Sequence, residues 1–454
     1  MTSIWWIRRD LRLTDNPALH AALAAGPVIP TFILDPAFSR ASPLRKDFLH
    51  AGLHALDRDL RTRGSYLVIR SGKPLGALKQ LLTETGANAI YAEEDFTPYA
   101  SKRDTETEHH LPLTLVNGQT IHHPTSVLKA DGRPYTIYTP YSKVWKAKLP
   151  AKITLYPAPE KISTPPGVDS ELLPKYKLSP LFPAGEQEAL VRLEEFLHQR
   201  IYAYGESRNR MDIDGTSALS PYIRFGMLGL RQAVRAGRQA MVEVRGEVSR
   251  KNAEIWLNEL IWREFYIQIL YHFPHVSKTA FNGSLANIPW HNNRSEFDAW
   301  KEGRTGVPVV DAGMRQLQET GWMHNRARMI VASYLVKDLL IDWRWGEDWF
   351  MENLLDGDPA ANNGGWQWIA GTGTDAAPYL RMFNPVLQST KFDPNGDYIR
   401  KWVPELRGLD AKDIHAPWKK GIQVKGYPEK PIVEPNKART MQAYQLAKEA
   451  ARTC

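Results

Sequence analysis

The N-terminal third of the chain alternates short apolar runs with longer amphipathic runs, and this alternation constrains the fold more than any other feature. Strand-like apolar runs occur at residues 4–7, 28–34, 66–69 and 89–91. Helix-like stretches separate them, the first through His20 and Leu23 and the next two at 46–62 and 75–85. Strands that alternate with helices of this length are typical of a parallel, doubly wound sheet. We therefore predict an α/β domain over residues 1–149.

The pattern changes twice after this domain. Prolines recur from Pro150 to Pro183 without hydrophobic periodicity, which predicts an interdomain linker over residues 150–185. From residue 186 the chain becomes helical, with amphipathic runs at 187–202, 251–270, 309–340 and 439–450. All tryptophans except Trp5, Trp6 and Trp145 lie in this part. Because 454 residues are too many for one ordinary core, we predict a second, all-α domain over residues 186–454.

Composition limits the functional classes. The net charge of +8 and the pI near 9.2 favour an anionic partner such as nucleic acid, although solubilising charge would give the same excess. The single cysteine, Cys454, excludes an intramolecular disulfide framework and a cysteine-based metal cluster. We expect no metal site and a cytoplasmic location. We also expect no membrane partner and no signal peptide, because long apolar runs are missing and the first residues already form a strand-like run. We expect no long disordered tail, because the chain ends soon after its last predicted helix.

The segment from Asp356 to Trp368 mixes residue types that pack poorly as a plain apolar core. It holds two carboxylates, adjacent carboxamides, paired glycines and two tryptophans, and it continues through residues 371–379. Such a mixture suits the wall of a pocket for a polar aromatic ligand, and a flavin is one such ligand. Taken singly, each residue is also an ordinary turn or packing residue.

This segment closely resembles the flavin-binding signature of the DNA photolyase and cryptochrome family, and the resemblance extends over nearly the whole chain. It implies a folded FAD in the helical domain, active in its reduced, anionic form. Asn362 matches the position that faces the redox-active ring nitrogen, where plant cryptochromes typically carry Asp and insect ones Cys. Further FAD contacts implied by the resemblance are Arg328, Asp356, Gly357 and Asp358.

Residues 212–221 place small hydroxyl residues before an expected helix start. Hydroxyls and exposed amides there can hold a pyrophosphate, although Ser and Thr in such places are usually helix caps. The family has a similar Gly-Thr-Ser-x-Leu-Ser at its FAD phosphates, preceded by a tyrosine. The resemblance thus implies FAD contacts for Tyr204, Thr216, Ser217, Ala218, Leu219 and Ser220.

Spacings of three and four place Trp256, Glu259, Arg263 and Tyr266 on one face of an expected helix. An amphipathic surface helix with a Glu259–Arg263 pair is the plainer interpretation. The resemblance implies that Trp256 and Arg263 contact FAD and that Arg263 also faces DNA. It further implies that Glu259 and Trp262 line the pocket for a flipped-out pyrimidine dimer, where Glu259 stabilises the dimer radical anion through a shared proton.

The segment from Gly321 to Met329 discriminates between lesions. A lone histidine on a helix is usually structural, and we interpret His324 in that way. Asn325 matches the carboxamide that holds the lesion in pyrimidine-dimer photolyases, whereas relatives that repair (6-4) photoproducts have a histidine there. The resemblance also implies a place for Met329 in the lesion pocket, and Arg328 matches the arginine that pairs with Asp356.

Three tryptophans, Trp290, Trp343 and Trp366, match the family's electron relay from the surface to the flavin, although each is also a convincing packing residue. A further set of residues matches DNA-contacting positions, and phosphate contacts of this kind would make binding depend on salt. These residues are Arg208, Arg326, Trp368, Arg381, Gln388 and Lys391.

A second, antenna chromophore is expected in the α/β domain. The Asn-Glu pair of folate-binding relatives is replaced by Tyr99 and Ala100, so folate is disfavoured. The segment 94–99 resembles the type that binds 8-hydroxy-5-deazaflavin, and a flavin or an empty pocket is also open. The implied pocket residues are Leu34, Asp35, Arg45 and Asp95.

We therefore expect a class I-like photolyase, an enzyme that acts as a monomer on damaged DNA and splits cyclobutane pyrimidine dimers with light. The alternatives are a cryptochrome-type blue-light signalling flavoprotein, a (6-4) photoproduct repair enzyme and an electron-transfer flavoprotein without a DNA partner. Glu259, Trp262, Asn325, Met329 and Asn362 favour repair of the cyclobutane dimer.

Overall fold

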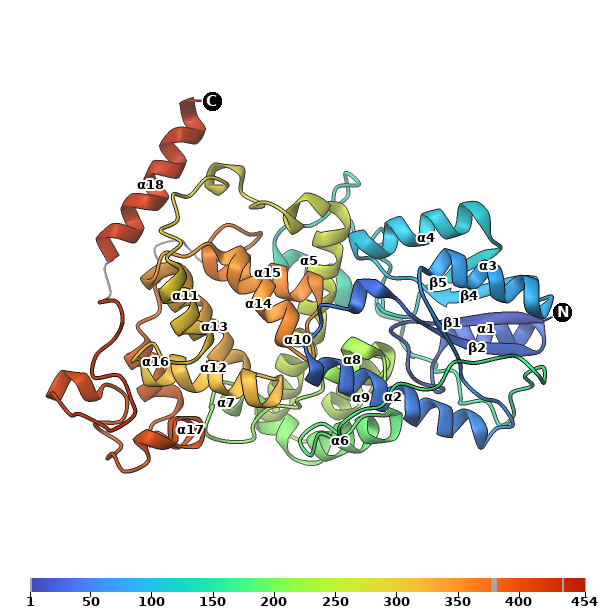
Figure 1. Cartoon of the computed structure of the whole chain (residues 1–454), viewed down its shortest axis with the longest axis horizontal. Helices are drawn as coiled ribbons and strands as arrows, with labels where there is room; N and C mark the ends of the chain where they lie inside the picture. The colour runs from blue at the N-terminus through green and yellow to red at the C-terminus, as the bar shows by residue number, and fades with distance from the viewer. Residues whose placement is uncertain (1, 377–381, 435–436, 454) are drawn as a thin grey trace. The chain divides into compact units, whose positions relative to one another are not determined.

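The computed structural model describes residues 2–376, 382–434 and 437–453, and the chain forms two compact units (Figure 1). The first unit comprises Met1–Tyr202 with Ser217–Pro274, and the second comprises Ala203–Thr216 with His275–Cys454. Residues 186–202 and 217–274 thus group with the sheet. The predicted domain boundaries after residues 149 and 185 follow composition instead, and they stay predictions.

The first unit contains the predicted parallel sheet. Its strands are β1 (Ser3–Ile7), β2 (Val28–Leu34), β3 (Val68–Ser71), β4 (Ala89–Glu93) and β5 (Leu113–Val116). Their order is β3-β2-β1-β4-β5 and all pairs are parallel, with Ile4 opposite both Ile29 and Ile90. The predicted α/β class is confirmed. The fifth strand was not predicted, because β5 is a short edge strand without a fully buried residue.

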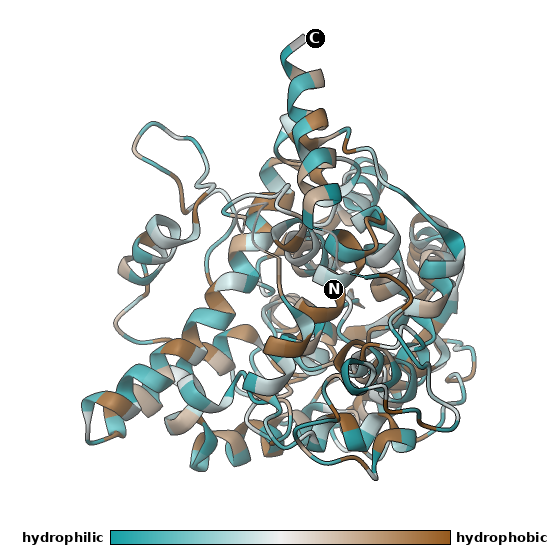
Figure 2. Ribbon diagram, turned by 90° about the vertical axis from the view of Figure 1, so that its left-hand side faces the viewer, coloured by the Kyte–Doolittle hydropathy of each residue, from teal (hydrophilic) through white to brown (hydrophobic). Residues whose placement is uncertain are grey.

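Helices cover both faces of this sheet. Leu78 and Leu81 of α3 pack with Ile4 and Trp6 of β1 on one face, whereas the Ser3 hydroxyl, which points to the other face, donates to the Ala22 carbonyl of α1 at 3.1 Å. The helices of the first unit are α1 (Pro17–Ala25), α2 (Pro43–Arg61), α3 (Pro74–Thr85), α4 (Pro98–His110), α5 (Tyr138–Ala147), α6 (Glu186–His198), α8 (Ser220–Phe225), α9 (Leu230–Glu243) and α10 (Glu247–His272). The ribbon that follows the N-terminus is hydrophobic, as expected for a strand buried on both faces (Figure 2).

A buried carboxylate anchors α10 within the first unit. Glu264 is almost fully buried and accepts hydrogen bonds from the Trp145 indole at 2.6 Å and from the backbone amides of Ile121 and His122. Burial raises the pKa of Glu264 to about 7, because the charged form is desolvated. These bonds tie α10 to α5 and to the segment before α5.

Among the described residues of the second unit, the regular elements are all helices. Its helices are α7 (Tyr204–Ser207), α11 (Arg294–Lys301), α12 (Pro308–Thr320), α13 (Asn325–Ser333), α14 (Trp343–Asn353), α15 (Pro359–Ala370), α16 (Pro385–Phe392), α17 (Asp397–Trp402) and α18 (Lys437–Thr453), with a π-helical turn η5 (Tyr334–Asp338). The run predicted over 309–340 is divided, because Gly321 adopts a left-handed φ of 68° that ends α12 and His324 caps the start of α13.

The core of the second unit is rich in tryptophan. Trp300, Trp343 and Trp366 are at most 2% exposed and lie in one apolar cluster. The ribbon of α18 is largely hydrophilic (Figure 2). Of its described residues, Thr440, Ala443, Tyr444 and Ala447 are buried, the last three in a smaller apolar cluster. Over the described ranges, the helices are too short or too polar to cross a lipid bilayer.

Candidate functional site

In the turn before α15, Asp358 stabilises the start of the helix. Asp358 is the N-cap residue, and its carboxylate accepts from the amides of Ala360 at 3.1 Å and Ala361 at 3.2 Å, with Pro359 in the first turn. An anionic cap also complements the positive end of the helix. Asp358 and Gly357 are buried, so the turn before α15 is part of the interior.

In the described structure, one of the two carboxylate oxygens of Asp356 has a hydrogen-bond partner and the other has none. Its Oδ2 accepts from Nη2 of Arg328 at 2.8 Å, as the resemblance implied, and Arg328 also donates from Nε to the Met323 carbonyl. Its Oδ1 is buried without a hydrogen-bond partner in the described structure. Leaving a buried carboxylate oxygen unpaired is costly, so Asp356 fits a ligand that brings a hydrogen-bond donor.

Asn362 follows one turn later with its carboxamide already oriented. Nδ2 of Asn362 donates to the Glu347 carbonyl of α14 at 3.0 Å, and Nδ2 of Asn363 donates to the Glu347 carboxyl group at 3.0 Å. Burial raises the pKa of Glu347 to about 8. The bond to Glu347 fixes the orientation of the Asn362 carboxamide, whose oxygen can still accept a hydrogen bond.

The three predicted relay tryptophans lie at different depths of the second unit. Trp366 and Trp343 are buried, whereas Trp290 is partly exposed and meets Tyr444 edge-on at 6.1 Å. A Cβ at Gly346 would lie 2.1 Å from the Trp366 ring, so only glycine lets α14 approach α15 so closely there. Trp368 is half-buried against the same core.

The predicted phosphate segment contains an uncommon backbone conformation. Ala218 has φ of 48°, which is rare for a residue with a Cβ and is often found at functional sites. The helix that follows, α8, starts at the exposed Ser220 but has only six residues, and Leu219 is buried. Because α8 is so short, this segment offers hydroxyl groups rather than the dipole of a long helix for hydrogen bonding. Tyr204 is buried and Thr216 is half-buried, both in the second unit.

Two predicted cofactor residues of the first unit contact each other. Nε1 of Trp256 donates to the Ser217 hydroxyl at 3.3 Å. The Trp256 ring is buried against Phe196, and Gly237 leaves room for it. On the predicted face of α10, four side chains are half-buried: Glu259, Trp262, Arg263 and Tyr266. This face is therefore less exposed to solvent than the plainer interpretation, a surface helix, would require.

His324 has the structural role predicted for it. Its Nδ1 accepts from the Arg326 amide at 3.1 Å, which caps α13, and its Nε2 is buried without a partner among the described residues. Burial, with Arg328 and Arg326 nearby, lowers the pKa of His324 to about 4, so the ring is neutral at pH 7. The next residue, Asn325, is exposed and lies beside the Met329 sulfur at 3.9 Å.

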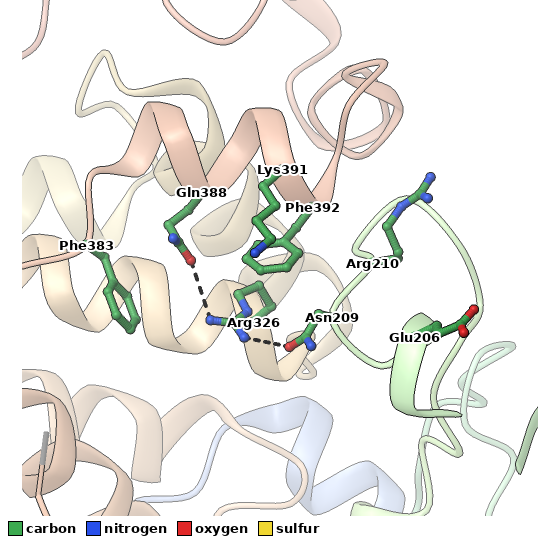
Figure 3. Close-up of a pocket in the computed structure, with 8 residues that line it drawn as sticks. All are labelled: Glu206, Asn209, Arg210, Arg326, Phe383, Gln388, Lys391 and Phe392. Carbon is green, nitrogen blue, oxygen red and sulfur yellow. Dashed lines mark hydrogen bonds between the residues drawn. The ribbon is translucent and has the colours of Figure 1, made fainter. Parts of the chain in front are cut away.

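A cavity of about 480 Å³ opens beside α13 and α16 (Figure 3). Arg326 is held there by Asn209 at 2.6 Å and Gln388 at 3.4 Å, and its guanidinium lies 4.4 Å from the Phe392 ring centre. The lining residues are Glu206, Asn209, Arg210, Arg326, Phe383, Gln388, Lys391 and Phe392.

Three of these lining residues, Arg326, Gln388 and Lys391, were predicted DNA contacts. The other five were not predicted, although Arg210 lies two residues after Arg208, Phe392 follows Lys391, and aromatic residues among basic ones are typical of nucleic-acid surfaces. Arg208 is half-buried at the end of α7. Arg381 lies outside the described residues.

Three of the four predicted antenna residues, Leu34, Asp35 and Asp95, lie at or after the carboxyl ends of strands. Asp35, after Leu34 of β2, caps a short 3-10 turn (Pro36–Phe38) and accepts a hydrogen bond from the Tyr99 hydroxyl. Asp95, after β4, accepts from the Thr97 amide and lies 3.4 Å from Arg9. Burial opposes ionisation of Asp95, but Arg9, Arg103 and Arg224 together hold its pKa below the ordinary value. Arg45 of α2 is buried against Phe38.

The sequence matches two family descriptions. Residues 3–161 match "DNA photolyase" and residues 256–448 match "FAD binding domain of DNA photolyase". A deoxyribodipyrimidine photo-lyase of Synechococcus sp. is 40% identical over 95% of this chain and 94% of its own length.

The structure is similar to solved structures of a photolyase and of a cryptochrome. A class III photolyase from Agrobacterium tumefaciens superposes with a TM-score of 0.90, at 36% identity over 99% of this chain and 98% of its own. The cryptochrome of Synechocystis sp. PCC6803 superposes with a TM-score of 0.86, at 30% identity over 100% of this chain and 98% of its own.

Proposed function

This chain belongs to the DNA photolyase family, and on that premise we propose that it repairs cyclobutane pyrimidine dimers in DNA with light. It is an enzyme with FAD as its cofactor. Bound reduced FAD, once excited by light, supplies the electron that opens the dimer's ring bonds and then takes it back.

The start of α13 carries the proposal, because it brings residues for three tasks within four positions. Asn325 is exposed beside Met329 and is proposed to hold the dimer. Arg326 faces the polar cavity with Gln388 and is proposed to bind phosphate. Arg328 pairs with Asp356, whose free oxygen is proposed to accept from the flavin.

The other proposed flavin contacts follow from the local geometry. Asn362 presents its carboxamide oxygen, which suits a ring N–H donor. Ser217 and its neighbours are proposed to bind the pyrophosphate, and the indole of Trp256 orients the Ser217 hydroxyl. Arg263 is proposed to contact both flavin and DNA.

Glu259 is proposed to act on the dimer itself. A carboxyl group can share a proton with a base carbonyl and so stabilise the extra negative charge of the radical anion. We propose that the dimer reaches this group by flipping out of the duplex, since chemistry on a base requires its removal from the stack. Trp262 and Trp368 are proposed to provide aromatic surfaces for it.

Three buried or half-buried indoles are proposed to reduce the oxidised flavin by passing an electron inward. Trp290 is partly exposed and Trp343 and Trp366 are buried, so one indole lies near the surface and two lie in the core, which supports the proposal. We also retain the domain assignment as a proposal, with residues 1–149 binding an antenna, 150–185 linking and 186–454 binding FAD and DNA.

Repair of a defined lesion tests the proposal. Reduced protein, incubated under blue light with an oligonucleotide carrying one thymine dimer, is expected to restore the two thymines, with none restored in the dark. Glu259→Ala should lower repair per absorbed photon while FAD content stays unchanged. An oligonucleotide with a (6-4) photoproduct should remain unrepaired.

Two outcomes would favour the alternatives. Full flavin content and light absorption without any repair would point to a signalling flavoprotein, for which the similarity to a cryptochrome structure is the supporting observation. Repair of the (6-4) lesion alone would reassign the substrate and the role of Asn325.

A further inference from the structure

Trp262 stacks face to face on a tyrosine from a different part of the first unit. Tyr138 is the first residue of α5, and its ring centre lies 3.7 Å from that of Trp262 with the planes tilted by only 4°. Aromatic pairs prefer offset or edge-to-face arrangements to a near-parallel overlay of this kind. Other contacts must therefore hold the two ring planes parallel.

Two contacts provide this restraint. The Tyr138 hydroxyl donates to the Asn258 carbonyl at 3.0 Å, one helical turn before Trp262 on α10. Phe265, which is fully buried, meets both rings edge-on, at 5.9 Å for Tyr138 and 5.5 Å for Trp262. The hydrogen bond fixes the far end of the phenol, and Phe265 fixes the ring edges.

We propose that Tyr138 is a positioning residue that fixes the orientation of the Trp262 indole. In this orientation Trp262 offers a stacking surface to a base of the dimer. The inference rests on the proposed role of Trp262 in the lesion pocket. Tyr138 covers part of one face of the indole, so the exposed area that half-buried Trp262 retains lies elsewhere on the ring. Stacking on a base requires parallel rings, and a restrained indole loses less freedom when the base arrives.

Substitution of the supporting ring tests this. Tyr138→Leu is expected to weaken binding to a thymine-dimer oligonucleotide roughly tenfold, because part of the stacking free energy between one base and Trp262 would be lost. Binding to undamaged DNA should stay unchanged. Tyr138→Phe keeps the ring and should restore most of the preference for the dimer. Tyr135→Leu is the matched control, because Tyr135 is also half-buried and precedes α5 without stacking on Trp262.

A double-mutant cycle separates positioning from general packing. If Tyr138 acts through Trp262, Tyr138→Leu causes no further loss of dimer affinity in a Trp262→Leu background. Near-ultraviolet circular dichroism should also lose the signal of the coupled pair in Tyr138→Leu and keep it in Tyr138→Phe. Additive losses, or equal losses for damaged and undamaged DNA, would overturn the inference.

The inference and the proposed function fail in different ways. Wild-type protein without any preference for dimer-containing DNA would overturn the proposed function and this inference with it. A wild-type preference that survives Tyr138→Leu would overturn the role of Tyr138 alone.

Discussion

His324 shows how one side chain is held in a single protonation state by its surroundings. It is 4% exposed, it caps α13 through Nδ1, and the nearest cationic groups are Arg326 and Arg328. Burial and these two arginines favour the neutral ring. Because Nδ1 accepts the Arg326 amide, the ring proton must be on Nε2.

This assignment predicts a specific dependence of stability on pH. The pKa of His324 is about 4 in the folded chain and near 6.5 when unfolded. Between these values the unfolded chain binds a proton that the folded chain lacks, so the stabilisation is complete above about pH 6.5 and is lost as pH falls to about 4. The unfolding free energy should fall by up to about 1.4 kcal/mol per pH unit in this window.

Comparison with His324→Asn isolates the effect, because asparagine also caps helices and does not titrate. Urea unfolding at pH 7 and pH 4.5 should show a larger loss for the wild type than for the variant. Equal losses would assign the acid sensitivity to other groups whose pKa burial lowers, such as His122.

Trp343 provides the second prediction at this scale. Trp343→Phe should block reduction of oxidised flavin by light and an external thiol, because phenylalanine is much harder to oxidise and interrupts the relay. The buried position should tolerate the smaller ring. Repair by chemically reduced variant protein should persist. Photoreduction at the wild-type rate would show that another aromatic route dominates.

At the scale of elements, the helix cap at the start of α15 lies within the proposed flavin-binding turn. Asp358 caps two amides of α15, and Asn293 caps two amides of α11 with the same geometry. The two caps are chemically similar, but only the first belongs to the proposed flavin turn.

Asp358→Ala should therefore cost about 1 kcal/mol of stability and also lower the amount of FAD retained after purification. Asn293→Ala should lower stability by a similar amount and leave the flavin content unchanged. Denaturant unfolding and the flavin-to-protein absorbance ratio measure the two effects. Equal flavin loss in both variants would reduce the role of Asp358 to helix stability.

The strand ends of the sheet support a separate prediction. We expect the purified protein, reconstituted with 8-hydroxy-5-deazaflavin, to gain a blue absorption band whose excitation reaches FAD. Asp95→Ala should weaken this uptake, because Asp95 and Arg9 form a buried polar pair at the strand ends. Asp57→Ala is the control, since Asp57 is equally buried but accepts from the Leu67 amide just before β3 starts. Stoichiometric uptake of folate would contradict the assignment.

At the scale of the whole molecule, the chain carries a net charge of +8, and the cavity beside α13 is lined by Arg210, Arg326 and Lys391 with Glu206 as its acidic residue. Affinity for DNA should fall steeply with salt, and Arg326→Ala should reduce the slope of log K against log salt by about one contact. Arg304→Ala, an exposed arginine paired with Glu302, should leave the slope unchanged. Affinity for damaged DNA that does not depend on salt would exclude phosphate binding there.

Local chemistry made several parts of this protein predictable from the sequence. The alternation of strand-like and helix-like runs predicted the parallel sheet, because burial on both faces demands nearly continuous apolar strands. The run from Asp356 to Trp368 indicated a polar pocket wall, and it led to the Arg328–Asp356 pair through the family resemblance.

Tertiary structure alone decided features that depend on residues far apart in the chain. Asn209 and Gln388 hold Arg326, and Tyr138 supports Trp262, although no local pattern links these positions. The free oxygen of Asp356 and the depressed pKa of His324 are likewise products of burial. Periodicity and spacing describe neighbours along one helix or strand, whereas desolvation and long-range contacts exist only once the elements have packed.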